Sequence, residues 1–152
     1  MGTDVTQERQ QAHALLDMLP EEKLTYRYAE NKWTIKEILV HLIDDERIYA
    51  YRALRFARND KTELPGFDQD EYAQQSGANA RDIKQILEEF ATVRSATISF
   101  FNGLDEDALT RAGVASGNVM SVRAAAYHIA GHELRHLNII KERYLSELKN
   151  EH

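Results

Sequence analysis

Three histidines stand at four-residue intervals in the segment YHIAGHELRHLNIIKERY, residues 127–144. His128, His132 and His136 share one face of the helix predicted for this segment, because residues four apart are offset by only about 40° around a helix axis. Either adjacent pair, His128 with His132 or His132 with His136, could therefore bind one metal ion from the same side. The spacing leaves both pairs open.

A third ligand has to come from elsewhere in the chain, because two imidazoles hold a metal poorly. The remaining histidines are His13, His41 and His152. Only His41 lies inside a second strongly apolar helical segment, WTIKEILVHLIDDERIYAYRALRFAR, on a face that begins apolar and becomes charged. We therefore expect His41 to complete the site, with His13 as a reserve candidate.

The residues from His132 to His136 also read His-Glu-Leu-Arg-His, which matches the H-E-x-x-H pattern of zinc peptidases. In those enzymes the glutamate, here Glu133, is the general base. A peptidase of this class needs a further downstream ligand and a strand that aligns the peptide, and only a short helical tail ending in His152 follows. We expect the match to be coincidental.

Composition limits the kinds of site and partner. The 152 residues include no cysteine, which excludes disulfides and thiolate ligands and leaves imidazole and carboxylate as the strong metal ligands. A net charge of -6 disfavours nucleic acid as a partner. No apolar run approaches the roughly 20 residues that cross a bilayer, and the first residues lack a signal-peptide pattern. We expect one domain, residues 1–152, in the cytoplasm, without a membrane contact.

Apolar periodicity predicts four long helices joined by polar links, and hence an all-α four-helix bundle. Thr34 with Glu37 forms a capping box at the start of the second helix, and Asn79 is the expected N-cap of the third. Gly113 is expected to close a short helix, and residues 114–121 to form an extended or hairpin-like link that ends at the N-cap Ser121. The link 61–79 is a long crossover between the second and third helices that covers one end of the bundle. The expected helices span residues 4–19, 35–59, 79–102 and 122–149.

Two stretches, KWTIKEILVHLIDDERIYAYRALRFARNDKTELPGFDQDEY and MSVRAAAYHIAGHELRHLNIIKERY, resemble the DinB-like (DinB/YfiT) superfamily of four-helix bundles. The resemblance extends over residues 26–145. It implies a divalent metal held by one histidine of the second helix and an H-x-x-x-H pair of the last, which are His41, His132 and His136 here. His128 has no ligand role in that motif, so the resemblance favours the pair His132 and His136. Zinc, nickel, iron and manganese all accept such ligands.

The function that the resemblance implies is a metal-dependent enzyme acting on a small molecule. Members of the family use the metal to activate water or a low-molecular-weight thiol, in hydrolysis, isomerisation or thiol transfer. Three histidines would leave positions open for solvent or substrate, as in catalytic metal sites. The alternative is a stress-response module that binds the metal without turnover.

Two further expectations concern residues around the site. Asp44, Asp45 and Glu133 are close in sequence to the ligands, so one of them could orient an imidazole, complete the ligand shell or act as a base. In the crossover, Phe67, Asp68 and Asp70 could contact a ligand, although a structural crossover is the simpler interpretation.

A homodimer is also expected, since members of the family often pair and tyrosine and arginine are enriched at interfaces. The strip proposed for that interface consists of Tyr49, Tyr51, Arg52 and Arg55.

Overall fold

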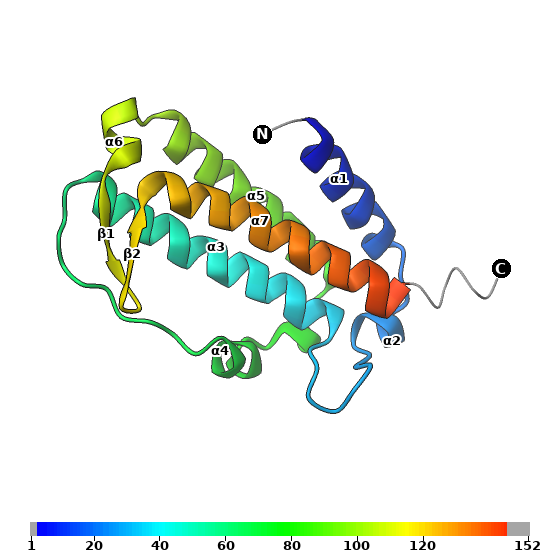
Figure 1. Cartoon of the computed structure of the whole chain (residues 1–152). Helices are drawn as coiled ribbons and strands as arrows, with labels where there is room; N and C mark the ends of the chain where they lie inside the picture. Colours follow the sequence, from blue (N-terminus) through cyan, green and yellow to red (C-terminus); the bar gives the residue numbers. More distant parts are fainter. Residues whose placement is uncertain (1–2, 146–152) are drawn as a thin grey trace.

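The structure, a computed structural model, describes residues 3–145 and is mostly helical, as predicted. Its four long helices form a bundle in which α3 packs mainly against α7 and α5, while α1 crosses one end against α5 and α7 (Figure 1). The long helices are α1 (Thr3–Asp17), α3 (Ile35–Ala57), α5 (Ile83–Asn102) and α7 (Val122–Ile140).

Shorter elements fill the connections. The link between α5 and α7 contains a hairpin in which Ala112 pairs with Ser121 and Ala115 with Asn118. Its turn residues Ser116 and Gly117 both have positive φ, 52° and 78°, as the tight turns of two-residue hairpins require. The short elements are α2 (Glu21–Leu24), α4 (Gln69–Gln75), the 3-10 turn η1 (Ala78–Ala80), α6 (Glu106–Thr110), β1 (Ala112–Ala115), β2 (Asn118–Ser121) and the π-helical turn η2 (Lys141–Leu145).

The predicted capping box begins α3. The Thr34 hydroxyl accepts a hydrogen bond from the Glu37 amide at 3.0 Å, and the Glu37 carboxylate accepts one from the Thr34 amide at 2.9 Å. The predicted N-cap of α5 is wrong. Asp82 caps that helix, because the η1 turn after Gly77 places Asn79 against α3, where its side chain accepts a 2.7 Å hydrogen bond from Thr34.

Several helices end at other residues than predicted. α1 ends at Asp17 and not at Leu19, and α3 ends at Ala57, before Asn59 with its positive φ of 62°. α6 ends at Thr110, so Gly113 lies in β1 and does not close the short helix. α7 ends at Ile140 in the π-helical turn, and residues 146–149 of its predicted extent lie outside the described residues.

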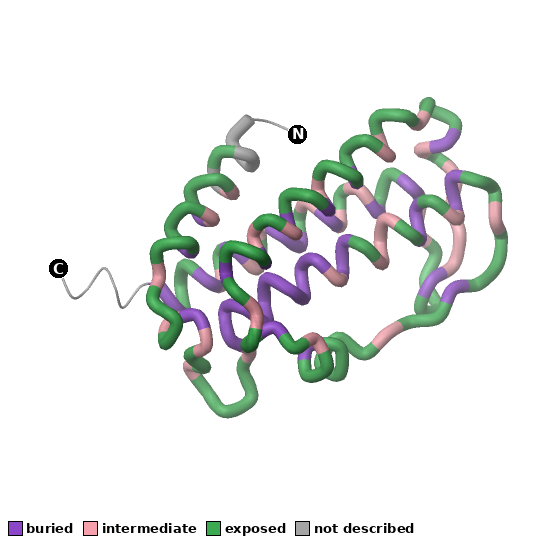
Figure 2. The backbone as a smooth tube through the Cα atoms, turned by 180° about the vertical axis from the view of Figure 1, so that it is seen from behind, coloured by how far each residue is buried: buried purple, intermediate pink, exposed green. Residues whose placement is uncertain are grey.

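Two apolar cores occupy the two ends of α3. Figure 2 shows the buried residues, in purple, along the length of the bundle. The larger core takes the stretch from Ile35 to Ile43, and the smaller one begins at Ala53. Between them, α3 buries the charged residues Asp45 and Glu46, which are 5% and 4% exposed. Burial of charge in mid-bundle requires partners, and these come from α7 and α5.

The strip expected to form a dimer interface is not one exposed surface. Arg52 is buried and donates hydrogen bonds to the Pro65 carbonyl and the Ser116 hydroxyl, both at 3.2 Å. Of the strip only Tyr51 is well exposed. Among the described helices, none has the length and apolar character needed to span a membrane.

Candidate metal centre

Three imidazoles from two helices converge inside the bundle, at the border of the larger core. His41 comes from α3, and His132 and His136 come from successive turns of α7. The Nε2 atom of His132 lies 3.1 Å from Nε2 of His41 and 3.2 Å from Nε2 of His136. The structure thus brings together the three residues that the family resemblance implied as ligands.

The spacing of these nitrogens fits a bound metal ion. Ligands about 2.0–2.1 Å from a tetrahedral metal lie roughly 3.3 Å from one another, and slightly closer in an octahedral arrangement. Burial, with the neighbouring His132 as the next cause, lowers the pKa of both His41 and His136 to about 4. Both rings are therefore neutral near pH 7 and can offer the lone pair that a metal needs.

Asp45 fixes the orientation of His132 from behind. Its Oδ2 atom lies 3.1 Å from Nδ1 of His132, so the ring donates its Nδ1 proton to the carboxylate and turns the Nε2 lone pair toward His41 and His136. Burial opposes the charge on Asp45, but hydrogen bonds from His128 and His132 outweigh it and hold the pKa of the carboxyl well below its usual range.

The His128 side chain contacts Asp45 and does not face His41. Its Nε2 atom lies 2.8 Å from Asp45 Oδ2, and its ring stacks on Tyr49 with 3.7 Å between ring centroids. Of the two pairs that the spacing left open, His132 with His136 faces His41. Asp45, His128 and His132 form a second group of possible ligand atoms, joined to the first through the two nitrogens of His132.

Glu133 belongs to a separate buried ion network. Its Oε2 atom lies 2.7 Å from Nη2 of Arg94, a residue of α5 that also binds Glu46 through two nitrogens. Glu133 is 1% exposed and directed away from the three imidazoles, as its offset of about 100° from His132 on the helix requires. This position gives it no part in an H-E-x-x-H peptidase site.

The other candidate residues have other roles. His13 packs edge-on against Phe90, with 4.9 Å between ring centroids, and His152 lies outside the described residues. Asp44 is not among the residues that face the imidazoles, and burial raises the pKa of its carboxyl. In the crossover, Phe67 contacts Tyr72 and Asp68 caps α4, whereas Asp70 lines the cavity next to His136.

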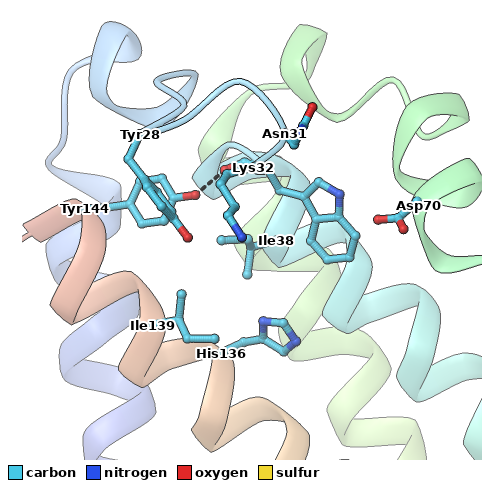
Figure 3. Close-up of a pocket in the computed structure, with 9 residues that line it drawn as sticks. Tyr28, Asn31, Lys32, Ile38, Asp70, His136, Ile139 and Tyr144 are labelled. Carbon is cyan, nitrogen blue, oxygen red and sulfur yellow. Dashed lines mark hydrogen bonds between the residues drawn. The ribbon is translucent and has the colours of Figure 1, made fainter.

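That cavity has a volume of about 240 Å³ and opens beside the candidate metal centre (Figure 3). His136 forms part of its wall, and the Nδ1 atom of this ring is buried without a hydrogen-bond partner among the described residues. Sequence reasoning missed the aromatic neighbours of the site. Trp33 packs against His41, with 4.7 Å between the ring centroids. The only sequence signal for this contact is that Trp33 stands just before the capping box.

Comparison with known proteins gives the family. The family model described as the DinB superfamily matches residues 4–140 of this chain. The chain belongs to the DinB superfamily. A relative from Oceanobacillus iheyensis, named "Putative metal-dependent hydrolase", is 30% identical over 128 residues, which are 83% of this chain and 73% of that protein.

A solved structure supports the bundle fold. It is that of YfiT from Bacillus subtilis, described as "a probable metal-dependent hydrolase with an unusual four-helix bundle topology". The TM-score is 0.70 with 15% sequence identity, and the match covers 92% of this chain and 81% of YfiT. At this identity the likeness concerns the fold alone. The four-helix bundle predicted from the sequence is confirmed.

Proposed function

We propose that this DinB superfamily protein is a metal-dependent enzyme that acts on a small molecule. Its metal ligands are His41, His132 and His136, and its reaction is hydrolysis or the transfer of a low-molecular-weight thiol. The convergence of three Nε2 atoms at 3.1 and 3.2 Å is the observation that supports the proposal most directly. The names of the Oceanobacillus relative and of YfiT point the same way.

The metal and each residue around the site would have a distinct role. A divalent ion held by the three imidazole nitrogens would supply Lewis acidity that brings the pKa of a water or thiol close to neutral. His41 and His136, neutral because burial lowers their pKa to about 4, present lone pairs at physiological pH. Asp45 holds His132 in the tautomer that leaves its Nε2 free to bind. The cavity at His136 gives a small substrate its way to the site.

Elemental analysis of untagged protein, purified without added metal, tests the ligand set. We expect close to one equivalent of zinc, nickel, iron or manganese per chain. Alanine at His41, His132 or His136 should lower metal affinity by orders of magnitude, because it removes one of three ligands. His128→Ala and His13→Ala are the matched controls and should keep the metal. Stoichiometric metal in the His41→Ala protein would refute the site.

The alternative, a stress-response module that binds metal without turnover, predicts a coordinatively closed ion. The cavity beside His136 favours the enzyme instead. Protein loaded with cobalt(II) distinguishes the two, since its visible spectrum reports the ligands. An open site changes its spectrum when azide or a small thiol such as cysteine is added, and a closed site does not.

Assembly and location are also part of the proposal. The expected homodimer is kept as a prediction, although the buried Arg52 removes the centre of the strip first considered for its interface. Light scattering at high micromolar concentration measures it. We likewise keep the proposal that the enzyme works in the cytoplasm as a single domain.

A further inference from the structure

Two charged side chains line the cavity beside His136. Apart from the proposed ligand His136, Lys32 and Asp70 are the only acidic or basic side chains among its described lining residues. Its volume of about 240 Å³ is below the roughly 300–1,000 Å³ of sites for drug-sized ligands, so its occupant is small.

The ammonium group of Lys32 points into this cavity and has no partner there. In Figure 3 its side chain extends from the segment before α3 toward Ile38 and the His136 side of the cavity. Among the described residues it forms no ion pair, with Asp70 or with any other carboxylate. A cation directed into a cavity without a counter-ion is an available contact for an anionic ligand.

The backbone holds Lys32 in this position. Its amide donates to the Ala29 carbonyl at 3.1 Å, and its carbonyl accepts a 2.9 Å hydrogen bond from Arg27. The same guanidinium forms an ion pair with Glu37 in the capping box of α3. The base of the Lys32 side chain is therefore fixed relative to the helix that contains His41.

The remaining walls suit an apolar body. Tyr28 and Tyr144 pack edge to face with 5.3 Å between ring centroids, and the Tyr144 hydroxyl donates to the Trp33 carbonyl. Burial, with Tyr28 as the next cause, raises the pKa of Tyr144 to about 12, so this hydroxyl stays neutral. Ile38 and Ile139 complete the apolar surface.

A single cation selects the charge of the ligand. Phosphate groups are held by several donors at once, by arginine forks or by backbone amides at a helix N-terminus. Lys32 is the single lysine or arginine among the described lining residues, and the negative Asp70 at the cavity disfavours a dianion. A carboxylate, with one charge, matches this arrangement.

We propose that the cavity binds a small organic carboxylate with an aromatic or branched apolar body, and that Lys32 pairs with its carboxylate. This places the apolar body between Tyr28, Trp33 and the isoleucines, next to His136. The inference rests on the proposed function only for the role of His136 at the metal. Lys32 is thus a substrate-binding residue that sets specificity for an anion.

The single tryptophan of the chain, Trp33, lines the cavity and reports its occupancy by fluorescence. We would titrate metal-loaded protein with phenylacetate and with its neutral analogue phenylacetamide, using calorimetry as a second readout. Phenylacetate should bind at least about tenfold more tightly than the amide. Lys32→Met keeps most of the apolar stem and should abolish this preference while leaving amide binding unchanged.

Lys84→Met is the matched control, because Lys84 is exposed on α5, does not line the cavity and carries the same charge. It should bind both probes as the wild type does. An unchanged preference in Lys32→Met, or no saturable binding of phenylacetate to the wild type up to about 50 mM, overturns the proposal.

The same titration on the His132→Ala protein, which lacks one of the three proposed metal ligands, separates this inference from the proposed function. A preference for the carboxylate that persists in this variant does not depend on the complete metal site. If the wild type holds no metal but Lys32 still determines a preference for the carboxylate, the anion site stands and the metal proposal fails. If metal binds as proposed but Lys32→Met does not alter the preference, the metal site stands and the anion site fails.

Discussion

At the residue scale, the position of Asp45 explains how one histidine can face two others. Oδ2 of this carboxylate accepts from Nδ1 of His132 at 3.1 Å and from Nε2 of His128 at 2.8 Å. The contact with His132 fixes both the tautomer and the direction of the ring. A buried negative charge that accepts a hydrogen bond from the His132 ring also makes this imidazole a stronger electron-pair donor to a cation.

We therefore predict that Asp45→Asn weakens metal binding by about 10- to 100-fold, the usual effect of losing such an outer partner. Competition with a chromophoric chelator measures the affinity. Asp44→Asn, one position earlier on α3 and outside the cluster, is the control and should bind as the wild type does. Equal affinities in all three proteins would show that Asp45 does not tune the site.

The sequence alone could not choose between these carboxylates. Asp44 and Asp45 follow His41 by three and four residues, so both lie on its side of the helix. Only the rotation of α3 against α7 decides which one meets His132. The exclusion of Glu133 was predictable, because adjacent helical residues are about 100° apart, and the structure places it against Arg94.

At the element scale, the two site-bearing helices were predictable and the connections were not. Apolar period, the Thr34 capping box and the Ser121 N-cap are local signals, and all three appear in the structure. The cavity depends instead on how the segment 25–34 folds over the end of α7 and over η2, through contacts such as that of Tyr144 in η2 with Trp33. Such contacts join residues far apart in sequence and leave no periodic pattern.

The position of Gly113 also depends on a contact between residues far apart in sequence, and this contact can be tested directly. It was expected to close a helix, yet it lies in β1 because the backbone there packs on Phe56. A Cβ atom at this position would stand 2.2 Å from two ring carbons of the fully buried Phe56. We expect Gly113→Ala to lower the free energy of unfolding by about 1–3 kcal/mol, the usual cost of overpacking.

Gly131→Ala is the matched control for that substitution. Gly131 lies on the exposed side of α7, and a Cβ atom there would meet nothing within 4 Å. Removing a glycine from the middle of a helix should raise stability by about 0.5–1 kcal/mol. Urea unfolding of both variants measures the difference, and a neutral Gly113→Ala would mean that the hairpin can shift away from α3.

At the scale of the whole molecule, the buried polar groups form a central layer where α3, α5 and α7 meet. Asp45 and its neighbour Glu46, which pairs with Arg94, lie on α3 between the two apolar cores. The three imidazoles border the larger core, whose residues flank His41 and His136 in sequence. Buried nitrogen lone pairs that face one another stabilise the fold poorly without a cation between them. The central layer should therefore be the part of the fold that depends most on the metal.

A bound metal ion should then stabilise the entire bundle, because it joins α3 to α7 and has no such site in the unfolded chain. At a free concentration 1,000 times the Kd, binding adds about 4 kcal/mol to the free energy of unfolding. For a domain of this size, that corresponds to a rise in Tm of roughly 10–15 °C. Thermal unfolding of chelator-treated protein, with and without added zinc, measures the shift.

The rise in Tm should persist in His128→Ala, which keeps all three proposed ligands, and disappear in His41→Ala, which leaves only the pair on α7. Equal stabilisation of His41→Ala would mean that zinc acts elsewhere on the chain, and the link between the two helices would then have no part in stability.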